Sequence, residues 1–196
     1  MKPRPAKTYQ RPRFVEFGSH DTSRNLPRTP ARKSSELDFL RQFERCYIAE
    51  ALGIAIAGRE FALEGFGRAD LLWLAWTAGA ASTEFTALAL KKRVRLTAIE
   101  AKLSDWRKGL QQAFRYRYFA HRSFLVLPMA TASIAARFLA TFRKLRVGLW
   151  GFDVQTGRLR KWFTPRCARP ISSKALQKAL HVIESSLELS QSPKSP

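Results

Sequence analysis

The fold is decided by two short stretches of the chain, Gly67-Arg68-Ala69-Asp70-Leu71-Leu72-Trp73 and Leu96-Thr97-Ala98-Ile99-Glu100-Ala101-Lys102-Leu103. Each is a short apolar run bounded by turn or basic residues, a pattern that predicts a β-strand. Both runs contain ionisable residues, which a buried strand normally excludes. Because side chains alternate across a strand, Glu100 and Lys102 project from the same face, about 7 Å apart along the strand.

A second carboxylate joins this pair if the strand that contains Asp70 lies beside the strand that contains Glu100. Two carboxylates and one lysine are the groups that a hydrated divalent cation and an activated water molecule require. The same residues also permit a structural interpretation, in which Glu100 and Lys102 form a buried ion pair. The sequence therefore predicts a cluster of ionisable groups at Asp70, Glu100 and Lys102, with both interpretations open.

Periodicity and turn residues predict the elements around these two strands. Helices are expected from residue 35 to about 53–58, from Ser104, as its N-cap, to about 121, over 130–145 and over 171–189. Further strands are expected at 61–64, followed by a turn at 65–67, and at 123–128, 147–152 and 159–163, the last as an edge strand. A loop with a short helical turn is expected over 77–90. This order predicts an α/β sandwich, a central mixed β-sheet flanked by helices on both faces.

Length and composition suit one globular domain with extensions. The chain has 196 residues, of which 45% are hydrophobic and 12% aromatic, enough to form a real core. Residues 1–35 contain nine Lys or Arg and five Pro, so we expect a largely disordered basic arm, solvated or folding on phosphates. The domain is expected over 36–170, with a C-terminal helix packed on it at 171–190 and a polar tail at 191–196.

The charge of the chain predicts a polyanionic partner. A formal net charge of +20 is far beyond what solubility requires and favours nucleic acid, with DNA expected and RNA equally compatible with the charge. The candidate contact residues lie before and after the strand that contains Glu100; they are Lys91, Lys92, Arg93, Arg107, Lys108 and Arg115. A solvated basic rim is the plainer interpretation of the same residues.

Cysteine usage and hydropathy favour a reducing intracellular compartment. The two cysteines, Cys46 and Cys167, are far apart and form neither a disulfide framework nor a metal-binding pair. We expect free thiols and a cytoplasmic, nucleoid-associated protein. No apolar run is long enough to cross a membrane, and the basic start lacks the apolar segment of a secretory signal, so no membrane partner is expected.

The pattern of charged residues resembles a known family. Asp70 on one strand, Glu100-Ala101-Lys102 at the end of the next, a helix before them and a helix with Gln112-x-x-x-Tyr116 after them are similar to the PD-(D/E)xK nuclease superfamily. That superfamily includes many restriction endonucleases and archaeal Holliday junction resolvases. The resemblance covers about residues 36–153, and Ala69 replaces the leading proline of the motif.

The resemblance implies a restriction-endonuclease-like fold and a metal-dependent phosphodiester hydrolase acting on DNA. It implies that Asp70, Glu100 and the Ala101 carbonyl bind Mg2+, for which Mn2+ can substitute, and that Lys102 orients or helps to deprotonate the attacking water. The product would carry a 5' phosphate. A homodimer or a recruiting protein partner is expected, since no separate specificity domain is recognisable. The alternative is a non-catalytic, basic nucleic-acid-binding protein on the same fold.

Three further residues are candidates for the catalytic site. In the superfamily an acid from the first helix often reaches the metal; Glu44 is favoured because it lies beside the apolar stripe, with Glu36 and Glu50 as rivals. Gln112 and Tyr116 are four residues apart and share one helix face, where they can hold a phosphate or order water. An ordinary amphipathic helix explains each of these residues equally simply.

Overall fold

The structure is a computed structural model that describes residues 13–16, 34–50, 55–76 and 94–189. The strands are β1 (Arg13–Glu16), β2 (Ala55–Leu63), β3 (Gly67–Trp76), β4 (Val94–Ala101), β5 (Arg122–Pro128), β6 (Val147–Phe152) and β7 (Leu159–Phe163). The helices are α1 (Ser34–Glu50), α3 (Trp106–Tyr116), α4 (Met129–Ala135), α5 (Leu139–Leu145) and α6 (Ser173–Leu189), with a 3-10 turn at Ala136–Phe138 between α4 and α5.

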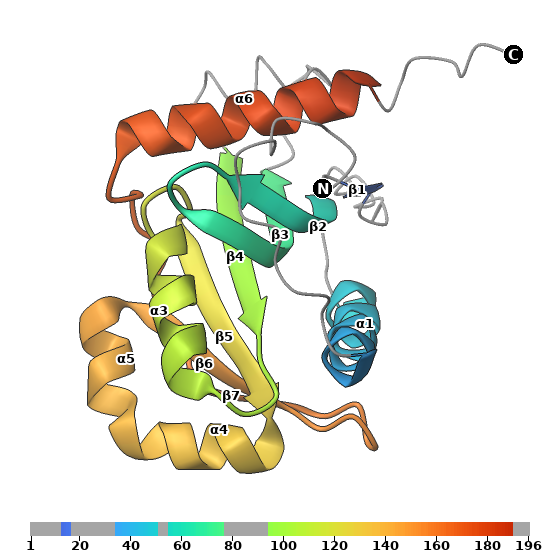
Figure 1. The fold of residues 1–196 in the computed structure, drawn as a ribbon, viewed down its shortest axis with the longest axis vertical. Coiled ribbons are helices and arrows are strands. Elements are labelled where there is room, and N and C mark those ends of the chain that lie inside the picture. The colour runs from blue at the N-terminus through green and yellow to red at the C-terminus, as the bar shows by residue number, and fades with distance from the viewer. Residues whose placement is uncertain (1–12, 17–33, 51–54, 77–93, 190–196) are drawn as a thin grey trace, which may run out of the picture.

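The strands form one mixed sheet in which the spatial order follows the sequence order, from β1 to β7 (Figure 1). β2, β3 and β4 are antiparallel neighbours, and β4, β5 and β6 run parallel to one another. The parallel strands require crossover connections, which α3 and the α4–α5 segment provide. β7 pairs antiparallel with β6. As a result, β4, β5 and β6 all end at the same edge of the sheet.

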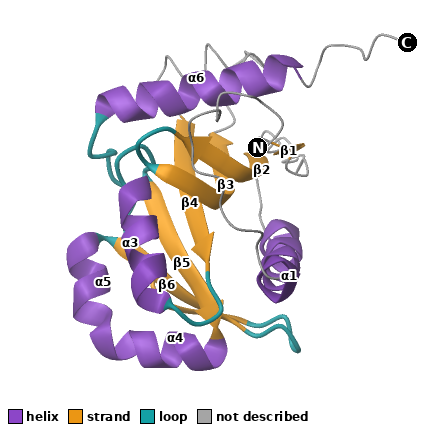
Figure 2. Ribbon diagram, in the orientation of Figure 1, coloured by secondary structure: helices purple, strands orange, loops and turns teal. Residues whose placement is uncertain are grey.

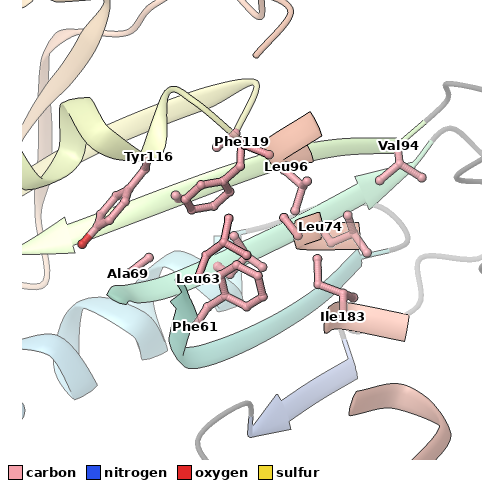
Figure 3. Close-up of a cluster of buried hydrophobic side chains, with 14 of the residues drawn as sticks. Phe61, Leu63, Ala69, Leu74, Val94, Leu96, Tyr116, Phe119 and Ile183 are labelled. Carbon is pink, nitrogen blue, oxygen red and sulfur yellow. The ribbon is translucent and has the colours of Figure 1, made fainter. Parts of the chain in front are cut away.

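Helices cover both faces of the sheet (Figure 2). α1 packs on one face, where its Phe39, Leu40 and Phe43 meet sheet residues that include Leu71 and Ile99. The other helices lie on the opposite face, in two clusters. One cluster joins α6 to β2, β3 and β4 around Phe61 and Phe119 (Figure 3), and the other joins α3, α4 and α5 to β5 and β6. Burial of these large apolar side chains, each contributing about 1.5–3 kcal/mol, holds the layers together.

The expected α/β sandwich, a mixed sheet flanked by helices, is confirmed. The strands expected at 147–152 and 159–163 have the expected bounds, and β2 and β3 form the expected hairpin. α6 packs on the sheet through Ala175, Ala179 and Ile183. The residues expected to form a loop and helical turn at 77–90 lie outside the described residues.

Several element boundaries differ from expectation. The strand expected at 61–64 is β2, Ala55–Leu63, which pairs with β3 on both sides of Glu60. The first helix ends by Glu50, because β2 begins at Ala55. α3 is capped by Asp105 rather than Ser104, since the Asp105 carboxylate accepts a hydrogen bond from the Lys108 amide. It stops at Tyr116 rather than near residue 121.

The loop after α3, the segment 129–145 and part of the N-terminal arm also differ from expectation. The buried Arg117 guanidinium donates to the Ala120 and His121 carbonyls, which fixes a loop where the helix was expected to continue. The helix expected over 130–145 is divided by the 3-10 turn, and β1 forms a strand within the arm that was expected to be disordered. Within the described residues, no helix is both long and apolar enough to traverse a membrane.

Candidate active site

Asp70 and Glu100 lie side by side on the central antiparallel pair of strands. Leu71 of β3 is opposite Ile99 of β4, so the next residues outward are Asp70 and Glu100. The Ala101 amide donates a hydrogen bond of 2.7 Å to Asp70 Oδ2, which ties the aspartate to the end of β4. Asp70 is 7% exposed and Glu100 only 1%. Two carboxylates are therefore held close together, largely away from solvent.

Lys102 completes this group, which we call the acid–lysine site (Asp70, Glu100 and Lys102). Its Nζ is 2.8 Å from Glu100 Oε1, and its backbone amide donates to the Val126 carbonyl at 3.1 Å. The lysine stem runs past α3 at Gly109, where an added Cβ would lie 3.0 Å from Lys102 Cγ. The absence of a side chain at Gly109 thus lets α3 pack closely on the lysine.

Tyr116 joins the acid–lysine site from α3. Its hydroxyl oxygen is 2.6 Å from Glu100 Oε2 and 2.5 Å from the Arg68 carbonyl oxygen. In Figure 3 the ring borders the buried cluster, with the hydroxyl directed away from Phe119. A phenol has one proton, and the Arg68 carbonyl can only accept. Both contacts become full hydrogen bonds when Glu100 Oε2 carries a proton and donates it to Tyr116.

The electrostatics agree with a protonated Glu100. Burial, followed by repulsion from Asp70, raises the pKa of Glu100 to about 8, despite attraction from Lys102 and the hydrogen bonds from Lys102 and Tyr116. Burial lowers the pKa of Lys102, but the attraction of Glu100, Asp70 and Glu36 outweighs it and raises the pKa overall. Lys102 favours the ionised state of Glu100, whereas burial and Asp70 favour the protonated state. The geometry of the tyrosine hydroxyl agrees with the protonated state.

Burial and the two nearby acids also raise the pKa of Tyr116 well above 10. Tyr116 is therefore neutral at physiological pH and serves as a hydrogen-bonding support for Glu100. Gln112 lies one turn earlier on the same helix, and its buried Oε1 accepts no hydrogen bond within the described part of the chain. The structure thus brings Tyr116 into direct contact with Glu100 and leaves Gln112 with an unused acceptor.

The donors at this site suit Mg2+. This ion is commonly bound by one or two carboxylates, with waters and substrate oxygens completing an octahedron. Asp70 and Glu100 supply two carboxylates, whose mutual repulsion a divalent cation would relieve. Among residues 34–50, 55–76 and 94–189, no three His, Cys, Asp or Glu side chains gather into a group able to hold a metal ion. The remaining ligands would come from Ala101, water or substrate.

The acids of α1 occupy two different places. Glu44 is buried and binds Arg59 of β2 through two contacts, at 2.5 and 2.7 Å, so the structure pairs it with an arginine on the α1 face of the sheet. Glu36 lies near the acid–lysine site instead, with Oε1 3.7 Å from Lys102 Nζ. The Glu50 side chain lies outside the described residues. The position of Glu36 depends on where α1 crosses the sheet, which helical periodicity does not specify.

We expect the two glutamates to have separate effects. Glu44→Gln should lower the free energy of unfolding by about 1–3 kcal/mol, because it weakens a charge-assisted pair and leaves the Arg59 guanidinium poorly compensated. It should leave the chemistry of the acid–lysine site intact. Glu36→Gln should cost less stability and instead change the titration of Lys102. Denaturant unfolding of both variants checks this, and equal losses of stability would contradict it.

The expected nucleic-acid contacts fall into two groups. Arg107, Lys108 and Arg115 are exposed on the outer face of α3, and the Arg107 guanidinium also stacks over the Trp106 ring at 4.6 Å. The run Lys91-Lys92-Arg93 lies outside the described residues. α3 therefore carries a basic outer surface on the same helix whose inner side contacts Lys102 and Glu100.

The raised pKa of Glu100 predicts a dependence of stability on pH. Between its ordinary value of 4.5 and about 8, the folded state retains a proton that the unfolded chain has lost, so the free energy of unfolding should fall as pH rises. The effect should be on the order of a few kcal/mol. The free energy of unfolding is measured against pH for wild type and for Glu100→Gln, both in EDTA, and the difference between the two curves gives the contribution of Glu100. A pH-independent difference would contradict the prediction.

Comparisons of the chain with protein-family models, with curated proteins and with solved structures gave no match. Interpretation of the acid–lysine site therefore rests on its own residues: two adjacent buried carboxylates, an ammonium and a supporting tyrosine.

Proposed function

We propose that this protein is a Mg2+-dependent DNA endonuclease that hydrolyses phosphodiester bonds at the acid–lysine site, on a restriction-endonuclease-like version of the α/β sandwich. One observation carries the proposal: Asp70, near the start of β3, and Glu100, near the end of β4, are buried side by side, with the Lys102 Nζ 2.8 Å from Glu100 Oε1. A net charge of +20 gives the chain the attraction for a polyanion that such an enzyme needs.

Each residue has a distinct role in the proposal. Asp70, Glu100 and the Ala101 carbonyl would hold Mg2+, with Mn2+ as a possible substitute. The bound ion would supply Lewis-acid stabilisation of the phosphate and a more acidic water. The raised pKa of Lys102 favours the ammonium form in the metal-free protein, so its proposed role is to orient water or phosphate by donating hydrogen bonds. Tyr116 fixes the orientation of Glu100, as outer partners of metal ligands commonly do.

The geometry of the helices adds two supporting contacts. The basic outer face of α3, which includes Arg107, Lys108 and Arg115, offers a track for the DNA backbone next to the acid–lysine site. Glu36 of α1 approaches Lys102 from the other face of the sheet and would help to keep the amine charged. Gln112, with its unused buried acceptor, would order water near Glu100.

The proposal is tested by incubating the full chain with branched, single-stranded and duplex DNA and with RNA, in the presence of Mg2+, Mn2+ or EDTA. Cleavage that needs the metal and leaves 5' phosphate ends is the expected result. Stable binding without cleavage of any substrate would favour the second candidate, a non-catalytic nucleic-acid-binding protein. That alternative has its own support, because the contacts with Lys102 and Tyr116 satisfy both carboxyl oxygens of Glu100 without a metal.

A further inference from the structure

An open cavity of about 330 Å³ lies on the α1 side of the sheet, at the edge where the Lys102 amine approaches Glu36 of α1, and it is within the size range of small-molecule pockets. Leu103, the residue after Lys102, forms part of its wall, and so does Ser35, the residue before Glu36. Pro128 and Phe152, at the ends of β5 and β6, also line the cavity. The cavity is thus at the carboxyl edge of the parallel strands, where open α/β sheets commonly bind ligands.

The lining of the cavity is mostly apolar. It includes Phe39 of α1 and Phe152 of β6, which are in edge-to-face contact with ring centroids 5.8 Å apart, and both are almost fully buried. Leu103 and Met129 are half-buried wall residues, and Val154 is 39% exposed. A flat, weakly polar group would cover these surfaces and gain free energy from their desolvation.

The polar residues at the rim do not suit a phosphate. None of the described lining residues is Lys or Arg, although the chain carries 35 basic residues, and the rim contains Asp38, Gln42 and Asp153. Asp153 is engaged by the Gln155 amide and the Thr156 hydroxyl. Asp38 is exposed on α1, where its carboxylate can accept hydrogen bonds. Carboxylate and amide acceptors match the amino and imino groups on the edges of nucleobases.

From this arrangement we propose that the cavity receives one unpaired nucleobase of the DNA strand whose phosphate lies at the acid–lysine site. The inference rests on the proposed function and specifies its substrate: DNA with an unpaired base next to the cleaved bond, in a single strand, a branch or a frayed end. A base within an intact duplex is stacked on both sides and cannot enter this cavity without being extruded.

The test uses the full chain and single-stranded oligonucleotides that carry the fluorescent base 2-aminopurine, with binding measured in EDTA. Met129→Trp fills the cavity, and Ile134→Trp, on the same helix at a position that is 54% exposed, is the matched control. Wild type and Ile134→Trp should change the 2-aminopurine emission at one position of the bound strand. Met129→Trp should abolish that change and weaken binding about tenfold, equivalent to about 1.4 kcal/mol.

A second variant keeps the test decisive if Met129→Trp folds poorly. Asp38→Ala alters an exposed helix residue and should reduce discrimination among the four bases at that position. Binding and emission that are equal in wild type, Met129→Trp and Asp38→Ala would overturn the inference, even if Mg2+-dependent cleavage is intact. If no cleavage is found but the emission change is preserved, the nuclease function would be rejected, whereas the proposal that the cavity binds a nucleobase (the proposed base pocket) would be supported.

Discussion

Asp70→Asn and Glu100→Gln should each reduce Mg2+-dependent cleavage to background while DNA binding is unchanged or tighter. Each variant removes one of the two adjacent carboxylates that would hold the metal, and a hard dication binds a neutral amide oxygen far less well than a carboxylate. Loss of a negative charge also lowers the repulsion between the site and the DNA phosphate. Cleavage rates at saturating DNA, together with binding measured in EDTA, separate the two effects.

Asp70→Asn and Glu100→Gln should both preserve the fold. Asn at position 70 retains an oxygen that can accept the Ala101 amide hydrogen bond. Gln at position 100 retains an oxygen for Lys102 and gains an amide that can donate to Tyr116, as a protonated glutamate does. Glu64→Gln is the matched control. Glu64 is an exposed acid in the turn between β2 and β3, and it pairs with Lys178 of α6. Full activity of either site variant would reject the site as located.

The sequence predicted the parts of this site that depend on local pattern. Asp70, Glu100 and Lys102 were identifiable because ionisable residues interrupt short apolar runs, and strand alternation alone puts Glu100 and Lys102 on one face. The hairpin turn before β3 is marked by two glycines with positive φ, Gly65 and Gly67, which turns of this kind require. Such signals lie within a few residues of the features that they specify.

The parts that were not predicted depend on contacts between distant elements. Glu44 and Glu36 are both plausible site residues on a helical wheel, and only the crossing of α1 over the sheet assigns one to Arg59 and the other to Lys102. Arg59 could not be recognised as a partner, because it lay between the expected end of the first helix, at 53–58, and the strand expected to begin at Phe61, whereas it belongs to β2. The end of α3 likewise depends on Arg117 binding carbonyls of the following loop.

The base pocket illustrates the same limit. Its lining comes from α1, the residue after Lys102, the start of α4 and the loop after β6, segments that are separated by more than a hundred residues of sequence. Phe39 and Phe152 have no feature in the sequence that distinguishes them from other core aromatics. A local pattern can therefore locate the ionisable residues Glu100 and Lys102, whereas the shape of the cavity requires the fold.

Lys102→Met should lower the cleavage rate by a factor of ~10^2 or more, the usual scale for losing a group that assists proton transfer or orients water, with little change in DNA affinity. Met preserves the apolar stem that packs near Gly109. Because Lys102 opposes the upward shift of the Glu100 pKa, its removal raises that pKa further. Glu100 then remains protonated over a wider pH range, rather than becoming an unpaired buried charge.

Lys102→Met should change the stability of the protein as well as its activity. At neutral pH, Lys102→Met should already unfold at a somewhat lower denaturant concentration than wild type, because the raised pKa of Lys102 reports a net attraction that the variant loses. The loss of stability relative to wild type should grow as pH rises above 8. Lys178→Met, which removes an exposed lysine from its pair with Glu64, is the control for loss of one positive charge. If Lys102→Met instead unfolds at neutral pH while Asp70→Asn stabilises the protein, the three residues form a structural ion network. The non-catalytic nucleic-acid-binding function would then be the better explanation of the basic surface.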